Sequence, residues 1–165
     1  MPLTATTIFY EKEEVNYRLP VRIKIPKVNV DASIQYVGLT PQGSVGVPNG
    51  PDDAAWFQNS PRPGEDGNAI IDGHSGWKDG IPAVFDNLFK LRKGDKVYIE
   101  NEKGNIVTFV VRESRTYSLD EDASDVFVSN DGKAHLNLIT CSGPWDKILK
   151  SHSDRLVVFT DKLTD

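Results

Sequence analysis

Short apolar runs separated by turn residues fill most of this 165-residue chain and restrict it to a small set of β folds. Val21, Ile23 and Ile25 alternate with Arg22 and Lys24, which is the period of two of a half-buried strand. Many short strands with turns between them favour a closed barrel or a sandwich, and the pattern alone does not separate the two. Further strands are expected at residues 32–37, 44–47, 70–74, 96–100, 105–113, 136–141 and 155–160.

The segments between these runs hold few regular elements. Pro82 and the apolar positions 84, 85, 88 and 91 predict one short helix over residues 81–91. Residues 54–57 fit a helical turn or the start of a strand, and residues 120–130 fit a loop with one helical turn. Residues 1–18 are polar without periodicity and predict a linker or arm ahead of a domain over 19–165. Residues 142–154 are expected to form a loop.

The composition excludes several classes of function but says little about the fold. The net charge of −5 argues against a nucleic-acid partner, because binding phosphate needs a basic face. The single cysteine excludes an intramolecular disulfide. No run approaches the ~18 apolar residues of a membrane span, and no signal peptide follows Met1. The length fits one domain with a real core.

Three of the expected strands each carry one reactive side chain near an end. Cys141 follows the apolar run 136–140 and precedes Ser-Gly-Pro, His74 follows the run 70–73, and Arg155 begins the run 155–160. A nucleophile, a proton donor or acceptor, and a fixed cation are the minimum set for thiol-based acyl transfer. The sequence therefore predicts a cysteine enzyme with His74, Cys141 and Arg155 as its catalytic residues.

These three motifs resemble those of the sortases, the cysteine transpeptidases of Gram-positive cell surfaces. Residues 138–141 (Leu-Ile-Thr-Cys) match the end of the family's Thr-Leu-x-Thr-Cys strand, with Asn137 in place of the first Thr. Residues 155–158 match its Arg-x-x-Val strand, and residues 70–74 match its apolar strand ending in Gly-His. The separations are also family-like: 67 residues (141 − 74) from His to Cys and 14 (155 − 141) from Cys to Arg. The resemblance covers roughly residues 19–162.

The resemblance implies a mainly β fold, a closed mixed β-barrel of seven or eight strands with short peripheral helices. It implies cleavage of a Leu-Pro-x-Thr-Gly-like sorting signal on a surface protein through a Cys thioacyl intermediate. The acyl group then passes to an amine of the cell wall. It further implies an ectodomain on the extracellular face of the membrane, held by an anchor that this sequence lacks. No metal or organic cofactor is required by this chemistry.

Simpler explanations compete for each catalytic candidate. Cys141 could be a small buried hydrophobe, and Arg155 could be a surface ion-pair partner. His152 is the rival to His74, whereas His135 lies six residues before Cys141 on one strand, or ~20 Å at ~3.4 Å per residue. Proton transfer does not reach that far. The two companion motifs favour the catalytic interpretation in each case.

Further candidates concern substrate and calcium. Trp77 and Trp145 follow the His and Cys motifs, Thr140 precedes the thiol, and Val126 and Phe127 fall where sortases receive the apolar part of the signal. All five are predicted substrate contacts, with core packing as the alternative for the aromatic residues. The acidic run 120–122 with Glu65 or Asp66 gives candidate calcium ligands, although short acidic runs are usually just solvated.

Three other functions stay open at this stage. A pilin-polymerising sortase would often carry an Asp-Pro-Trp lid ahead of the His region, and residues 1–18 contain no Trp. A cell-wall L,D-transpeptidase would carry a Ser/Thr-His-Gly-Cys run, which residues 140–142 lack. A non-catalytic β-barrel binding module would leave Cys141 inert to thiol reagents.

Overall fold

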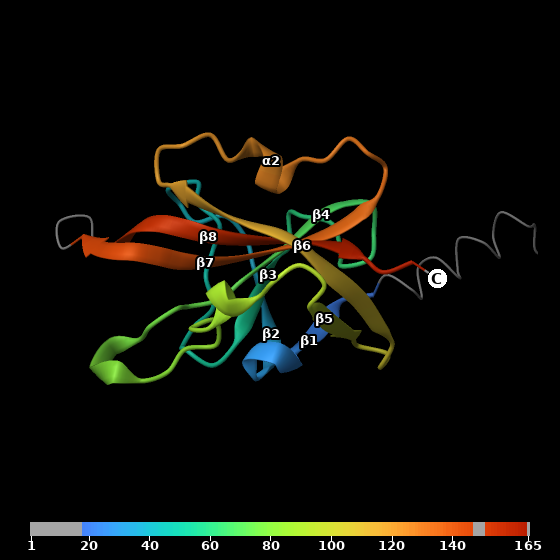
Figure 1. Cartoon of the computed structure of the whole chain (residues 1–165), viewed down its shortest axis with the longest axis horizontal. Coiled ribbons are helices and arrows are strands. Elements are labelled where there is room, and N and C mark those ends of the chain that lie inside the picture. The colour runs from blue at the N-terminus through green and yellow to red at the C-terminus, as the bar shows by residue number, and fades with distance from the viewer. Residues whose placement is uncertain (1–17, 147–150, 165) are drawn as a thin grey trace, which may run out of the picture.

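The computed structural model describes residues 18–146 and 151–164. Within these residues eight strands close into a barrel in the order β1-β2-β3-β4-β7-β8-β6-β5 (Figure 1). Two neighbouring pairs, β2–β3 and β4–β7, are parallel and the others are antiparallel. The prediction of a closed mixed barrel of seven or eight strands is therefore confirmed. The strands are β1 (Pro20–Ile25), β2 (Val30–Val37), β3 (Ala54–Phe57), β4 (Gly67–Asp72), β5 (Lys96–Asn101), β6 (Ile106–Ser118), β7 (Ala134–Asp146) and β8 (Ser151–Lys162).

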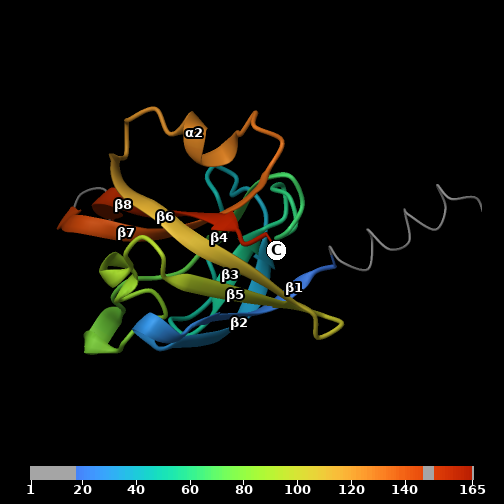
Figure 2. The ribbon, with the colours of Figure 1, turned by 45° about the vertical axis from the view of Figure 1, so that its right-hand side comes forward.

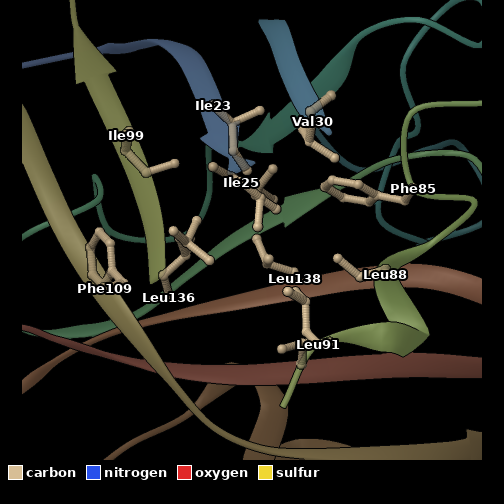
Figure 3. Close-up of a cluster of buried hydrophobic side chains, with 14 of the residues drawn as sticks. Ile23, Ile25, Val30, Phe85, Leu88, Leu91, Ile99, Phe109, Leu136 and Leu138 are labelled. Atoms are coloured by element: carbon tan, nitrogen blue, oxygen red, sulfur yellow. The ribbon is translucent and has the colours of Figure 1, made fainter. Parts of the chain in front are cut away.

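Branched aliphatic and aromatic side chains from almost every strand fill the barrel interior. Figure 3 shows this cluster, in which Ile23 and Ile25 of β1 meet Leu136 and Leu138 of β7. The alternation of β1 is as predicted, with Ile23 and Ile25 fully buried and Lys24 between them exposed. Burying such side chains contributes roughly 1.5–3 kcal/mol each.

The predicted helix over residues 81–91 is wrong. Residues 84–87 form turns and only η3 (Leu88–Lys90) is a short 3₁₀ helix. The amides of Val84 and Phe85 donate to the carbonyls of Pro51 and His74 instead of to a preceding helical turn. The apolar spacing nevertheless has a cause, because Phe85, Leu88 and Leu91 all enter the barrel core. The other 3₁₀ helices are η1 (Pro26–Val28) and η2 (Lys78–Gly80).

Two strand predictions in the first third need correction. Residues 44–47 form no strand, only an isolated bridge from Val45 to Leu39 around a turn at Thr40–Gly43. Residues 54–57, which fitted two structures, form the buried strand β3, parallel to β2. The hairpin predicted around residues 101–104 is confirmed by the antiparallel pairing of β5 with β6.

The segment after Cys141 is also not the loop that was predicted for residues 142–154. β7 runs through Cys141 to Asp146, and β8 begins at Ser151, with a register shift between Ser142 and Trp145. β7 and β8 continue beyond the barrel because they pair with each other as a two-stranded ribbon. The predicted arm at residues 1–18 falls, apart from Arg18, outside the described residues.

A second apolar cluster lies outside the barrel, where the segment between β6 and β7 covers the sheet. This segment contains the single-turn helix α2 (Ser124–Phe127), which agrees with the helical turn expected within residues 120–130. Figures 1 and 2 both show α2 above the β6–β8 side of the barrel. Its Val126 packs with Ile70 of β4 and Val157 of β8. This outer face, between the covering segment and the strands, is where the candidate site lies.

Candidate active site

Antiparallel pairing of β7 with β8 places Cys141 directly opposite Arg155. Alternation puts both residues on the outer face, since their strand neighbours Ile139 and Val157 belong to the outer cluster. Arg155 is also paired with Tyr117 of β6 on its other side. Its guanidinium donates to the carbonyls of His152 and Asp154, at 3.2 and 3.0 Å. A half-buried thiol thus shares a sheet face with a half-buried guanidinium.

Parallel pairing of β4 with β7 brings His74 to the same place. The last paired residues are Asp72 and Ile139, and the amide of Gly73 donates to the carbonyl of Ile139 at 3.2 Å. The Thr140 hydroxyl donates to the Gly73 carbonyl at 2.8 Å, which continues the register by one residue. The next position on each chain is His74 on one side and Cys141 on the other. The three sequence-predicted catalytic residues therefore come together just after the end of β4, within β7 and within β8.

The loop that carries His74 is fixed at several points. The imidazole donates through Nε2 to the buried carbonyl of Pro48 at 2.8 Å, and its ring lies edge-on to Trp77 with centroids 5.0 Å apart. Asp86 accepts the amide of Gly76 at 2.6 Å and that of Ala83 at 3.0 Å. The contacts with Pro48 and Trp77 fix the orientation of the imidazole.

Position 73 has no room for a side chain, which explains the glycine there. A Cβ there would lie 2.7 Å from both Phe85 Cδ2 and Val84 Cγ1, and these are packed side chains. Any larger residue would push residues 84 and 85 away, and with them the loop that closes over His74. The glycine that precedes the histidine is thus required by close packing rather than by an unusual backbone angle.

Burial and two opposite charges act on the thiol. Burial raises the pKa of Cys141, the Arg155 guanidinium lowers it, and the Asp72 carboxylate raises it, with burial the largest effect. The net direction is upward, so the resting form near neutral pH is the thiol. A reactive thiolate at Cys141 would consequently need a neighbouring base, and His74, which follows the paired end of β4, is the candidate.

Asp72 is a further candidate for the site that the sequence analysis did not identify. It is 7% exposed, and its Oδ1 has no hydrogen-bond partner among the described residues. Burial raises the pKa of its carboxyl to about 8. The available signal was a lone acid at the end of a strand of fully apolar neighbours, immediately before Gly-His.

Asn137, which stands where the family has Thr, contacts the covering segment. Its Nδ2 donates to the carbonyl of Val126 at 2.7 Å, and Asn68 Nδ2 donates to the same carbonyl at 3.1 Å. Two buried amides thereby tie α2 to β4 and β7. The departure from the family motif thus bonds the segment between β6 and β7 to the outer face of the sheet.

The predicted substrate contacts have different settings. Thr140 is buried and uses its hydroxyl on Gly73, and Val126 is 1% exposed within the outer cluster. Phe127 is 41% exposed and lies edge-on to Phe57, with ring centroids 6.5 Å apart. Trp77 is half-buried against His74. The side chain of Trp145 lies outside the described part of the structure, and contact with substrate stays a prediction for all five.

The other two histidines lie elsewhere. Alternation along β8 puts His152 on the opposite face from Arg155. His135 sits near the start of β7 between Asp131 and Asp161, with both nitrogen–oxygen distances 2.7 Å. A pocket of about 350 Å³ opens beside it, lined by Arg112, Arg115 and Phe159 among others. That pocket contains none of the catalytic candidates, and the cations beside it are paired with carboxylates.

The candidate calcium ligands act as local caps in this structure. Asp120 and Glu121 accept from Ser118, and Asp122 accepts from the amide of Ser124. Glu65 accepts from the amide of Arg62. Within residues 18–146 and 151–164 no group of three or more His, Cys, Asp or Glu side chains is arranged to hold a metal. These carboxylates do not fit a shared calcium site as they stand, and calcium dependence stays an untested prediction.

Comparison with known proteins agrees with the motifs. A family model of the sortase domain matches residues 23–163, so the chain belongs to the sortase family. A lid mutant of sortase C1 from Streptococcus agalactiae superposes with a TM-score of 0.66 at 24% identity, covering 92% of this chain and 72% of that one. Sortase C-1 from Actinomyces oris gives 0.65 at 23% identity, covering 100% and 85%. Sortase C from Clostridium perfringens gives 0.64 at 19%, covering 88% and 71%.

At these identities the structural likeness concerns the fold. A comparison with curated proteins gives no significant match. No helix in the described part of the chain has the length and apolar character needed to cross a membrane.

Proposed function

We propose that this protein is a cysteine transpeptidase that cleaves a Leu-Pro-x-Thr-Gly-like sorting signal and joins its acyl part to an amine. The observation that carries the proposal is the pairing of Cys141 with Arg155 across β7 and β8, with His74 next to the thiol through the β4–β7 register. Membership of the sortase family supports substrates with a sorting signal and amine acceptors in general. No cofactor enters this chemistry.

The reaction follows from the three side chains. Cys141 Sγ attacks the carbonyl carbon of the Thr residue, and the Arg155 guanidinium stabilises the negative charge that develops on the oxygen. His74 takes the proton of the Cys141 thiol during this attack and passes it to the departing amine as the Thr–Gly carbon–nitrogen bond breaks, so that a thioacyl enzyme remains. An incoming amine then attacks the thioester and gives a proton to His74, the carbon–sulfur bond breaks, and His74 returns the proton to the departing sulfur to restore the Cys141 thiol.

The acceptor is the less determined part of the proposal. An amine of a cell-wall precursor is the acceptor that the resemblance implies. A lysine of a pilin subunit is the second candidate, favoured because the similar solved structures named above are all sortase C enzymes, one of them a lid mutant. Both acceptors place the enzyme at the outer face of the membrane.

Peptide cleavage followed by mass spectrometry tests the proposal. The protein is incubated with a Leu-Pro-x-Thr-Gly peptide library, alone, with triglycine, or with a lysine-containing pilin-like peptide. The Cys141→Ala variant is the control, because it removes only the thiol from a half-buried position. We expect cleavage after Thr, transfer to one acceptor, and loss of both reactions in the variant.

The acceptor arms separate the two candidates, since preference for the lysine peptide identifies a pilin-type enzyme and preference for triglycine identifies an anchoring enzyme. Absence of cleavage with every library member, by folded protein whose Cys141 also resists alkylation, would replace the proposal with a binding module.

A further inference from the structure

Asp72 ends β4 at the point where the chain turns into the histidine loop. Its backbone pairs with Ala55 of β3 on one side and with Ile139 of β7 on the other. The side chain is 93% buried (100 − 7), and its Oδ1 has no hydrogen-bond partner within the described residues. Leaving a buried carboxyl oxygen without a hydrogen-bond partner destabilises the folded state, so a structural role alone does not explain Asp72.

The side chain shares its sheet face with the thiol. Ile70 and Asn68, two and four residues earlier on β4, point to the outer face, where Asn68 bonds Val126 and Ile70 joins the outer cluster. Asp72 follows them in the period of two. On β7 the same face carries Ile139, the register partner of Asp72, and then Cys141. The negative charge of the ionised carboxyl raises the pKa of Cys141.

The charged surroundings of Asp72 come from a few elements. β3 contributes only apolar residues, Ala54–Phe57. β7 contributes Cys141, β8 contributes Arg155, and β6 contributes Tyr117 beside Arg155. The loop after β4 contributes His74. The effect of burial dominates over these groups and raises the pKa of the Asp72 carboxyl to about 8, so the acid form prevails at neutral pH.

We propose that Asp72 is a positioning residue that controls the Cys141 thiol: as a neutral acid it tolerates a thiolate beside it, and as a carboxylate it suppresses that thiolate. This inference rests on the proposed function only in taking Cys141 as the nucleophile. As pH rises and Asp72 ionises, its negative charge should make the Cys141 thiolate less stable. An isolated thiol would instead become more reactive over the same pH range.

The reactivity of the thiol can be measured without any substrate. The rate of alkylation of Cys141 by iodoacetamide is followed from about pH 5 to about pH 10 for the wild type and Asp72→Asn. Asn keeps the size and a hydrogen-bond donor but cannot ionise, so the apparent pKa of Cys141 should fall by about one unit. Asp31→Asn is the matched control, because it removes an exposed carboxylate on β2 that pairs with Arg22. Its alkylation profile should coincide with that of the wild type.

Equal alkylation profiles for wild type and Asp72→Asn would overturn the proposal. A measurement on the wild-type protein keeps it testable if the variant does not fold. Carbon-13 NMR of the aspartate carboxyl carbons should show one that titrates near pH 8, and sequence-specific assignment in the wild-type protein should identify it as Asp72. Titration of every aspartate below about pH 5 would contradict the inference.

The two proposals fail separately in these experiments. A shifted alkylation profile without peptide cleavage would retain the role of Asp72 and reject the transpeptidase function. Peptide cleavage with coincident alkylation profiles would retain the transpeptidase function and reject the role of Asp72.

Discussion

The two faces of β7 have opposite compositions. On the inner face Leu136 and Leu138 are fully buried among the aliphatic side chains of the barrel core. On the outer face Asn137, Ile139 and Cys141 alternate with them. The outer face also buries an amide and a carboxyl group, since Asn137 is 0% exposed and Asp72 on neighbouring β4 is 7% exposed.

This difference shows that the two faces of one strand contribute differently, one to the stability of the fold and the other to the candidate site. The inner face contributes apolar burial, which needs no particular partner. The outer face contains groups that are costly to bury unless they are bonded or serve the reaction. Substitutions on the inner face should therefore change stability, and substitutions on the outer face should change activity or its pH dependence.

The largest effect is expected for Cys141→Ala. Loss of the nucleophile should lower the transpeptidation rate by roughly 10⁴-fold or more, with the thermal unfolding midpoint close to that of the wild type. Peptide turnover by mass spectrometry and a thermal melt check the two parts. Retained turnover would show that the outer face is not organised around this thiol.

Arg155→Lys should lower kcat/KM by about 10²–10³-fold, because an ammonium cannot reproduce the fork of donors that faces the developing oxyanion. Steady-state kinetics with the preferred peptide measure this effect. Arg112→Lys is the matched control, since Arg112 lies on β6 beside Phe159, away from the thiol. An equal loss in both variants would indicate a general effect of surface charge.

Asp72 should make stability depend on pH. Its folded pKa of about 8 lies above its unfolded value near ~3.9, so the folded state keeps a proton that the unfolded state releases. The free energy of unfolding should therefore fall as pH rises from about 4, by up to about 4 kcal/mol at pH 7. For Asp72→Asn, the free energy of unfolding from urea titrations should change less with pH, by about that amount. The same pH dependence in wild type and variant would contradict the raised pKa of Asp72.

Leu138→Ala should lower the free energy of unfolding by about 3 kcal/mol, because it leaves a cavity in the barrel core. Activity per folded molecule should remain. Ile139→Ala is the neighbouring control on the outer face, where the half-buried side chain leaves a smaller cavity. A larger stability loss in Ile139→Ala would reverse the proposed division between the faces.

The smallest effect is expected for Asn137→Ala, about 1 kcal/mol from the lost hydrogen bond to Val126. Faster amide exchange in α2 should accompany it. A double-mutant cycle with Asn68→Ala sharpens the test, because both amides donate to the same carbonyl and should be non-additive. Additive effects would mean that the two amides hold the covering segment independently.

The sequence predicted an element correctly where the residue pattern is compatible with only one type of secondary structure. The alternation in residues 20–25 and the two runs around residues 101–104 predicted β1 and the β5–β6 hairpin correctly. The three motif strands predicted which residues the barrel brings together. Their register, and hence the placement of His74 beside Cys141, needs the β4–β7 pairing, which no local pattern encodes.

The errors arose where tertiary contacts replaced local preferences. Val84 and Phe85 have helical spacing, but their amides bond Pro51 and His74 across the site. The chain continues as a strand after Cys141 because β8 supplies a partner, despite the Ser-Gly-Pro turn signal. Asp72 gave no motif at all, because its importance comes from burial next to a thiol that lies far away in the sequence.

The parallel pairing of β4 with β7 has a consequence for how the protein matures. Its partners are separated by 67 residues, as in Gly67 and Ala134 (134 − 67), so this contact forms late and slowly compared with hairpins. β7 and β8 are also the last strands to be synthesised. A nascent chain accordingly carries its imidazole long before it carries a nucleophile, and reactivity begins only when the final two strands close the barrel.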